Sequence, residues 1–268
     1  MNRVMIKLMA TDVDGTLVKE GSPEVSDAVI EEIQRLEDIG IHVVIASGRQ
    51  YASLHKLFAR ANRKLSYIAE NGAHIIVDDE NLHLVKMERK YVEQLMEDLR
   101  ALYKEDCHVV ASTSKGCFLE SKSEEFIHLI RDSYRNEVKL TDDLLKEDVE
   151  FIKLAIYKKG SIKELGENYL IPKWKDKVKA CMAGAEWVDF MDHSVDKGNG
   201  LAILLNHLGF TKDEVMVFGD NENDIGLMKA AKHSYAVENA MDCVKEAAAH
   251  ICPPYWEDGV LQVLRTLE

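Results

Sequence analysis

Two aspartates, Asp12 and Asp14, directly follow the mostly apolar, strand-length run Val4–Thr11. Like charges in one cleft are costly unless something positive binds between them. Carboxylate oxygens at this density suit Mg²⁺, which binds one or two carboxylates together with substrate phosphate and water. A carboxylate can also attack phosphorus directly, which splits a hydrolysis into two easier steps. The pair therefore predicts magnesium-assisted chemistry at phosphorus.

Polar side chains also follow two other strand-length runs. The segment Ser47–Arg49 follows Ile41–Ala46, and the segment Gly219–Asp224 follows Val215–Phe218. In an open parallel sheet, ligands bind beyond the carboxyl ends of the strands. We therefore expect both segments to line the same site as Asp12.

A lysine is also needed at such a site, because an anionic nucleophile that approaches a phosphate dianion is repelled. Mg²⁺ and a positioned lysine can offset this repulsion and stabilise the equatorial phosphate oxygens. Lys197 is the best-placed candidate, since it begins a helical stretch that runs to about Leu208. The amino end of that helix would add a favourable dipole.

The elements that must position these residues follow a regular order. Strand-length apolar runs alternate with stretches of helical period as far as Ala69 and again from Lys197 onward. The first helical stretch repeats apolar residues from Val25 to Leu36 and stops at Gly40. This alternation predicts an α/β fold, a doubly wound parallel sheet with helices on both faces.

The middle of the chain has a different pattern of short strands and helices. An antiparallel hairpin is expected around the turn Asp78–Asn81, and the acidic segment 141–150 is expected to be a solvated loop or a helix end. We expect an α+β cap domain at 81–189, inserted into a discontinuous catalytic core of residues 1–80 and 190–268.

Composition limits the possible partners. The 268 residues include 34 Lys and Arg against 47 Asp and Glu, a net charge of −13, which disfavours nucleic acid. No apolar run approaches the roughly 18 residues of a membrane span, and the start of the chain does not resemble a signal peptide. The cysteines are odd in number and form no CxxC pair, which is typical of reduced thiols: Cys107, Cys117, Cys181, Cys243 and Cys252. We expect a soluble cytoplasmic protein without a membrane partner.

Four segments resemble, in order, the four motifs of the haloacid dehalogenase superfamily. Asp12–Leu17 is similar to the first motif, Ser47–Arg49 to the second, Lys197–Gly198 to the third and Gly219–Asp224 to the fourth. The order, the spacing and the large insertion between the second and third motifs resemble the Cof-type phosphatases, whose cap domain lies there. The resemblance covers essentially the whole chain and implies a Rossmann-like core with a cap.

The resemblance implies catalytic roles for three residues. Asp12 would be the nucleophile and a metal ligand. Asp14 would be the general acid and base, and its backbone carbonyl would bind the metal. Lys197 would neutralise Asp12 and the substrate phosphate. An acid at the position of Asp14 marks phosphatases and phosphomutases, whereas dehalogenases and phosphonatases of the superfamily lack it.

Binding roles follow from the same resemblance. Ser47, with Gly48, would hydrogen-bond the phosphoryl group, and Asn223 would contact phosphate or a metal-bound water. Asp220 would ligate Mg²⁺, and Asp224 would hold the metal shell or Lys197 in place.

The pattern leaves two residues without a role. Arg49 suits either a substrate contact or a structural ion pair. Asn71 lies in Glu70–Ala73, which matches a Cof-type signature after the third core strand, but the match assigns it no chemistry.

The implied activity is a magnesium-dependent hydrolysis of small organophosphates, such as sugar phosphates or related metabolites, through an aspartyl-phosphate. A phosphomutase of the same superfamily is the nearest alternative. A receiver-type signalling module also combines Mg²⁺, a phosphorylated aspartate, Ser/Thr and Lys, but it needs neither Asp14 nor a long insertion. A purely structural alternative, in which the aspartates form a solvated turn and cap helices, does not explain why four motifs occur in order.

Overall fold

The computed structural model describes residues 5–268, which form two compact units. The first unit contains the chain as far as His83 and Asp196–Glu268, and the second, the inserted unit, is Leu84–Val195. The sequence placed the insert earlier, at 81–189. The difference arises because strand pairing keeps the chain in the first sheet through Leu84 and in the second sheet through Met191.

The first unit is built on an eight-stranded sheet with the order β14-β13-β12-β1-β2-β3-β4-β5. Neighbouring strands from β14 to β3 run parallel, and β3 and β4 run antiparallel. The sequences of these strands are nearly continuous apolar runs because helices bury both faces of a parallel sheet. Their bounds are β1 Leu8–Thr11, β2 His42–Ala46, β3 Ser66–Ala69, β4 His74–Val77, β5 Glu80–Leu84, β12 Val215–Gly219, β13 His233–Val237 and β14 His250–Cys252.

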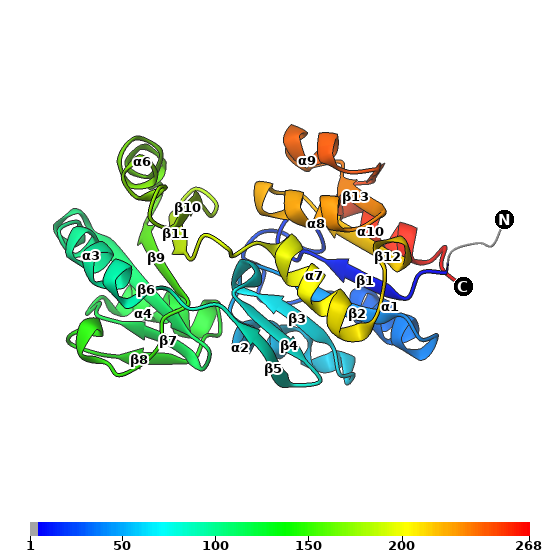
Figure 1. The fold of residues 1–268 in the computed structure, drawn as a ribbon, viewed down its shortest axis with the longest axis horizontal. Helices are drawn as coiled ribbons and strands as arrows, with labels where there is room; N and C mark the ends of the chain where they lie inside the picture. The colour runs from blue at the N-terminus through cyan, green and yellow to red at the C-terminus, as the bar shows by residue number, and fades with distance from the viewer. Residues whose placement is uncertain (1–4) are drawn as a thin grey trace. The chain divides into compact units, whose positions relative to one another are not determined.

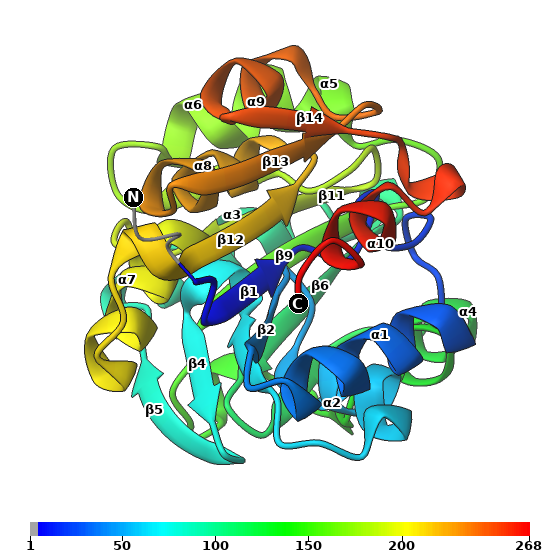
Figure 2. The ribbon, with the colours of Figure 1, turned by 90° about the vertical axis from the view of Figure 1, so that its right-hand side faces the viewer.

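Helices cover both faces of this sheet, with α1, α2 and α10 on one face and α7 and α8 on the other (Figure 2). Helix α1 begins where the Ser26 hydroxyl accepts a hydrogen bond from the Val29 N–H, and its buried stripe includes Ile33 and Leu36. The helices of this unit are α1 Asp27–Asp38, α2 Tyr51–Phe58, α7 Lys197–Leu208, α8 Ile225–Ala230, α9 Asp242–Ala247 and α10 Gly259–Leu264.

The inserted unit has a six-stranded sheet with the order β10-β11-β9-β6-β7-β8, antiparallel except for the pair β7 and β8 (Figure 1). Apolar side chains of α3 and α6, such as Leu95 and Trp174, pack on one face, and Phe126 of α4 packs on the other. The bounds are α3 Arg89–Arg100, β6 Cys107–Thr113, β7 Gly116–Leu119, α4 Glu124–His128, β8 Val138–Leu140, β9 Lys153–Lys158, α5 Lys163–Leu165, α6 Ile171–Trp174, β10 Lys179–Met182 and β11 Trp187–Met191.

The predicted fold class is confirmed, a doubly wound α/β core with an inserted α+β unit. Several details differ. Val4, the expected start of the first strand, lies outside the described residues. The hairpin turn is shorter than predicted, because Asp78 and Asp79 alone connect β4 and β5, with φ angles of 52° and 65°. The three-residue edge strands β8 and β14 were not predicted.

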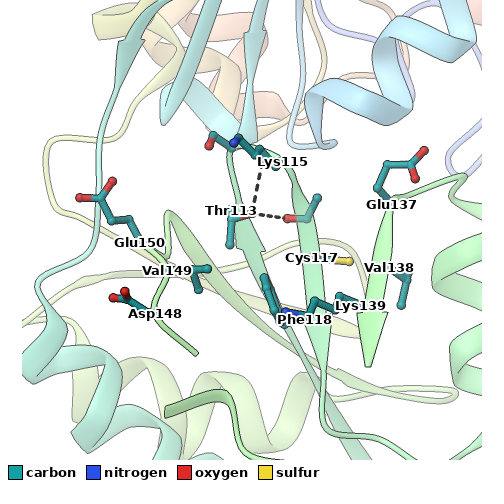
Figure 3. A pocket seen from close by; sticks show the side chains of 12 residues that line it. Thr113, Lys115, Cys117, Phe118, Glu137, Val138, Lys139, Asp148, Val149 and Glu150 are labelled. Atoms are coloured by element: carbon teal, nitrogen blue, oxygen red, sulfur yellow. Dashed lines mark hydrogen bonds between the residues drawn. The ribbon is translucent and has the colours of Figure 1, made fainter. Parts of the chain in front are cut away.

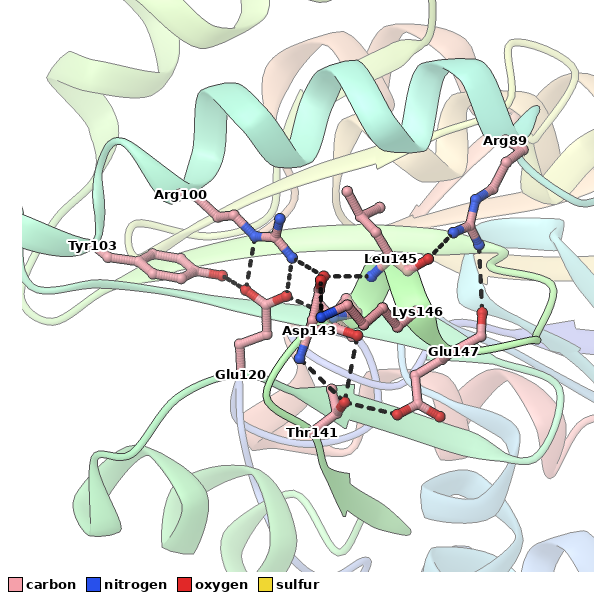
Figure 4. A network of polar contacts seen from close by, with 10 residues as sticks. Arg89, Arg100, Tyr103, Glu120, Thr141, Asp143, Leu145, Lys146 and Glu147 are labelled. Carbon is pink, nitrogen blue, oxygen red and sulfur yellow. Dashed lines mark hydrogen bonds and ion pairs between the residues drawn. The ribbon is translucent and has the colours of Figure 1, made fainter.

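The acidic segment 141–150 is more ordered than the sequence indicated. It contains a short 3₁₀ turn, Leu144–Lys146, capped by the Asp143 carboxylate. Arg100 of α3 binds this carboxylate and also that of Glu120, so the segment is tied to the sheet and to a helix (Figure 4). Within residues 5–268, no helix is long and apolar enough to cross a membrane.

Candidate active site

The site lies in the first unit, where three neighbouring strands end. Thr11 of β1 lies opposite Phe218 of β12 and Ile45 of β2, so the loops that follow these strands leave the sheet at the same edge. Asp12 is the first residue after β1, and Asp220 is the first residue after β12. Parallel pairing thus brings together carboxylates that are more than 200 positions apart in the chain.

Lys197 joins two of the aspartates. Its Nζ donates hydrogen bonds of 2.7 Å to Asp12 Oδ1 and 2.7 Å to Asp224 Oδ1. The side chain of Lys197 is fully buried, and so is that of Asp224. Lys197 is the first residue of α7, and Asp196 caps this helix by accepting hydrogen bonds from the Gly198 and Asn199 N–H groups.

A third carboxylate completes the cluster. Asp12, Asp220 and Asp224 each offer one oxygen, and these three atoms lie within 4.8 Å of one another. Thr16 Oγ1 donates to Asp220 Oδ1 at 3.2 Å. Three carboxylates therefore surround one ammonium, which leaves an excess of two negative charges when all are ionised. This excess matches a divalent cation.

Burial and this excess charge raise the pKa values of two of the carboxyl groups. Burial raises the pKa of Asp12 well above its usual value, and the charges of Asp224 and Asp220 add to the rise, while Lys197 opposes it. The pKa of Asp220 is raised to about 7, mainly by burial and then by Asp224. Burial alone would lower the pKa of Lys197, but Asp12 and Asp224 raise it, so the ammonium stays charged.

One buried oxygen of the cluster has no hydrogen-bond partner among the described residues. Asp12 Oδ2 is buried, and no polar atom of the described residues bonds to it, whereas Oδ1 of the same carboxylate is held by Lys197. A buried, unpaired carboxylate oxygen is costly unless a cation or an electrophile meets it. The residues therefore fit a cation or a reacting phosphoryl group at this atom.

The turns around the cluster depend on close backbone packing. Gly15 has a φ of +82°, and a Cβ at this position would lie 2.2 Å from Asp220 Oδ2, so only glycine fits. Asp224 Oδ2 accepts hydrogen bonds from the Asp220 N–H at 3.0 Å and from the Asn221 N–H at 3.1 Å, which fixes the loop after β12.

The other predicted binding residues form a connected string. Ser47 is buried, its carbonyl accepts the Asn71 N–H at 3.0 Å, and Asn71 Oδ1 accepts Asn223 Nδ2 at 2.9 Å. A Cβ at Gly48 would lie 3.1 Å from Asn71 Oδ1, so this glycine also lies against the same asparagine. Asn71 thus links the loops after β2 and β12.

Asp14 is held outside the three-carboxylate cluster. Its carboxylate accepts two hydrogen bonds from Arg49, of 2.7 Å to Oδ2 and 2.6 Å to Oδ1. Arg49, whose role the sequence left open, is therefore the ion-pair partner of Asp14.

Comparison with known proteins decides the family. The haloacid dehalogenase-like hydrolase family matches residues 9–264. The chain belongs to this family. A 5-amino-6-(5-phospho-D-ribitylamino)uracil phosphatase of Bacillus subtilis is 30% identical over 264 residues, which cover 98% of this chain and 96% of that protein. A phosphoglycolate phosphatase of Methanobrevibacter smithii is 26% identical over 261 residues, 97% of each chain.

Solved structures agree with this assignment. A crystal structure of a protein from Eubacterium rectale has a TM-score of 0.86 and 40% identity, and the match covers 98% of this chain and 100% of that one. The family and these relatives identify this hydrolase as an enzyme, a phosphatase, and the expected Cof-type assignment is confirmed.

Two residues of this hydrolase's site were missed from the sequence. Thr16 lies within the first motif but was given no role of its own, although its hydroxyl donates a hydrogen bond to Asp220. Asn239 donates from Nδ2 to the Gly15 carbonyl at 2.8 Å, and its Oδ1 accepts the Tyr255 N–H. The signal for Asn239 was available, because it follows β13, whose carboxyl end lies at the same edge of the sheet.

A separate pocket lies within the inserted unit of this hydrolase. It has a volume of about 680 Å³ and is lined by Thr113–Phe118, Glu137–Lys139 and Asp148–Glu150 (Figure 3). Its lining includes none of the residues of the carboxylate cluster.

Proposed function

We propose that this protein is a magnesium-dependent phosphatase that hydrolyses small phosphomonoesters through an aspartyl-phosphate on Asp12. The observation that carries this proposal is the state of the Asp12 carboxylate. One oxygen is fixed by Lys197, and the other is buried and has no partner among the described residues. A carboxylate held in this way is oriented for attack, and no hydrogen bond occupies the attacking atom.

The reaction takes two steps on the chain's own residues. In the first, Asp12 Oδ2 forms a bond to phosphorus, the ester P–O bond breaks, and Asp14 gives its proton to the leaving alcohol. In the second, water attacks phosphorus, Asp14 takes a proton from that water, and the bond between Asp12 and phosphorus breaks. Asp14 and Asp12 are then both restored.

Electrostatics make the first step possible. Lys197 lies beside Asp12 and would also face the phosphoryl oxygens, and Asp224 fixes its ammonium. The acidic cluster would hold Mg²⁺, with Asp12 and Asp220 as ligands and Asp224 supporting the shell; the Asp14 backbone carbonyl is proposed as a further ligand. When bound, the metal supplies positive charge that offsets the repulsion between carboxylate and phosphate.

Phosphoryl binding is proposed for the remaining predicted residues. The Ser47 hydroxyl and the backbone at Gly48 would donate to phosphoryl oxygens, as would Asn223. Support comes from the string of contacts through Asn71, which holds the loops after β2 and β12 against each other.

Small alkyl phosphates are the proposed substrate class, with sugar phosphates and related metabolites first. The named substrates of the two relatives, a phosphoribityl compound and phosphoglycolate, are both phosphate esters of alcohols. An alcohol is a poor leaving group, so such substrates need the proton that Asp14 is proposed to deliver.

The test is a panel of phosphomonoesters incubated with the purified protein and Mg²⁺, with phosphate release as the readout. We expect many turnovers on sugar phosphates and other small alkyl phosphates, and none with Asp12→Asn. A stable phosphoprotein without turnover would indicate a receiver-type module, and an isomerised sugar phosphate would indicate a mutase. Either outcome would contradict the proposal.

A further inference from the structure

Arg49 and Asp14 form a two-point ion pair in the first unit. Arg49 Nε donates to Asp14 Oδ2 at 2.7 Å, and a terminal nitrogen of the same guanidinium donates to Asp14 Oδ1 at 2.6 Å. The Arg49 side chain is only 10% exposed, so solvent competes little for these bonds. A fork of this kind fixes the plane of a carboxylate as well as its position.

The pair also holds the loop that follows the first motif. Asp14 Oδ1 accepts the Gly21 N–H at 2.8 Å, and Arg49 donates to the Ser22 carbonyl at 2.8 Å. Gly21 has a φ of +73°, a conformation that glycine adopts without strain. Asp14, Arg49 and the loop around Gly21 therefore restrain one another.

The backbone of Arg49 is itself anchored to the site. Its N–H donates to Ser47 Oγ at 3.1 Å, and its carbonyl accepts the Glu70 N–H at 3.0 Å. Because the Arg49 backbone is held at both its N–H and its carbonyl, the guanidinium has a restrained position, and its two hydrogen bonds restrain Asp14 in turn.

The hydrogen-bond count shows which Asp14 oxygen is left for chemistry. A carboxylate has about four lone-pair positions. Asp14 Oδ1 accepts two hydrogen bonds, from Gly21 and Arg49, while Oδ2 accepts one, from Arg49. Oδ2 therefore keeps a lone-pair position open, and Arg49 determines where this atom lies.

We propose that Arg49 is a positioning residue for Asp14, and that it acts on the reaction through Asp14 without binding the phosphoryl group. This inference rests on the proposed function, in which Asp14 protonates the leaving group. Loss of the fork would leave the Asp14 carboxylate restrained by Gly21 alone, and a displacement of about 1 Å can lower a rate by roughly 10²-fold.

The experiment is a double-mutant cycle of Arg49→Ala and Asp14→Asn, with kcat and KM measured on an alkyl phosphate and on nitrophenyl phosphate. We expect Arg49→Ala to lower kcat by about 10- to 10²-fold on the alkyl phosphate. In kcat/KM, which reports the first chemical step alone, its effect on nitrophenyl phosphate should be much smaller, because that leaving group needs little protonation. In the Asp14→Asn background, Arg49→Ala should cause little further loss.

Two further variants serve as controls. Arg49→Lys keeps the charge without the fork and should lose kcat in the same leaving-group-dependent way, so it provides the readout if Arg49→Ala fails to fold. Arg63→Ala removes an arginine that pairs with Asp38 on the surface of the same unit, and it should change neither kinetic constant.

The outcomes separate this inference from the proposed function. An Arg49→Ala loss that is equal on both substrates, raises KM and adds fully to that of Asp14→Asn would show direct phosphate binding by Arg49 and overturn the inference alone. An Asp14→Asn loss in kcat/KM, which reports the first chemical step alone, that is itself equal on both substrates would overturn the acid role of Asp14 and the inference with it.

Discussion

Each unit of the molecule contains a cation held between two carboxylates, and the two clusters differ in what they leave unpaired. In the first unit, Lys197 lies between Asp12 and Asp224. In the inserted unit, Arg100 lies between Glu120 and Asp143 (Figure 4). The arrangement of charge is similar, so the difference in their surroundings must decide what each cluster does.

The cluster of the inserted unit is fully satisfied. Glu120 Oε1 accepts hydrogen bonds from Arg100 and the Leu144 N–H, and Oε2 accepts from Arg100 and the Tyr103 hydroxyl. The hydrogen bond from Arg100 lowers the pKa of Asp143. Every charge in this cluster has a partner, which favours a structural role in holding the acidic segment 141–150.

The cluster of the first unit has more negative charge than its cation can compensate. A third carboxylate, Asp220, adds negative charge, and Asp12 Oδ2 has no partner among the described residues. Burial and these charges raise the pKa values of Asp12 and Asp220. A cation shared between carboxylates whose oxygens all have hydrogen-bond partners therefore has a structural role, whereas an excess of carboxylate oxygens without partners indicates a ligand site.

The largest expected effect comes from Asp12→Asn. The amide has the shape of the carboxylate and can still accept from Lys197, but it cannot attack phosphorus. We expect kcat to fall by at least about 10³-fold while the far-ultraviolet circular dichroism spectrum stays unchanged. Retention of a tenth of the activity would contradict the role of Asp12 as nucleophile.

Removal of metal should have a comparable effect without any mutation. Chelation should abolish phosphate release, and added Mg²⁺ should restore it. Ca²⁺ should bind but support little turnover, because its larger and looser coordination shell would let Asp12 adopt a non-attacking geometry. Full activity in excess chelator, with metal removal confirmed by elemental analysis, would disprove the metal requirement.

A smaller effect concerns stability and pH. The pKa of Asp220 is about 7 in the folded protein, against an ordinary value of 3.8. Between these values the unfolded chain releases a proton that the folded protein keeps, so through Asp220 alone the metal-free protein loses up to about 1.4 kcal/mol of stability per pH unit as pH rises. Mg²⁺ favours the ionised carboxylate, so its stabilising effect should grow over the same window.

This prediction can be checked by thermal unfolding with and without Mg²⁺ at about pH 5 and about pH 8. The rise in melting temperature caused by Mg²⁺ should be larger at the higher pH in the wild type. In Asp220→Asn this difference should shrink, because the titrating group is gone. Equal Mg²⁺ effects at both pH values in the wild type would count against Asp220 as a metal ligand.

The smallest effect on activity is expected in the inserted unit. Glu120→Gln should lower the free energy of unfolding by about 1–3 kcal/mol, because it weakens the bonds to Arg100 and leaves that charge poorly compensated. The kcat for nitrophenyl phosphate should stay within about twofold. Urea unfolding measures the change in stability, and the phosphatase assay measures the change in kcat. Glu88→Gln, which removes one partner of an exposed ion pair with Lys90, is the matched control and should leave the free energy of unfolding unchanged. A large loss of kcat without loss of stability would refute a purely structural role.

The carboxylate cluster of the first unit could largely be predicted from the sequence, whereas the Arg100 cluster of the inserted unit could not. Strands β1, β2 and β12 are buried on both faces, so their apolar runs are clear, and the acids that follow them stand out. The beginning of α7 at Lys197 was predicted at the correct residue. Local pattern was sufficient there because each signal lies within one element.

The remainder depends on contacts between distant parts of the chain. The partner of Arg49 lies 35 positions away, and no local pattern points to it. The Arg100 cluster joins a helix, a strand end and a loop, and from the sequence the segment 141–150 looked only acidic. Strands β8 and β14 have three residues each at sheet edges, which is too short for a periodic pattern to indicate a strand.

The central claim, that Asp12 carries the phosphoryl group, can be tested by trapping the intermediate. The protein would be mixed with Mg²⁺ and substrate, quenched in acid during the first turnovers and reduced with borohydride, which converts a phosphorylated aspartate into homoserine. We expect homoserine at position 12 in peptide mass spectra of the wild type, and none in Asp12→Asn. Continued phosphate release with Asp12 unmodified, or homoserine at another aspartate, would contradict it.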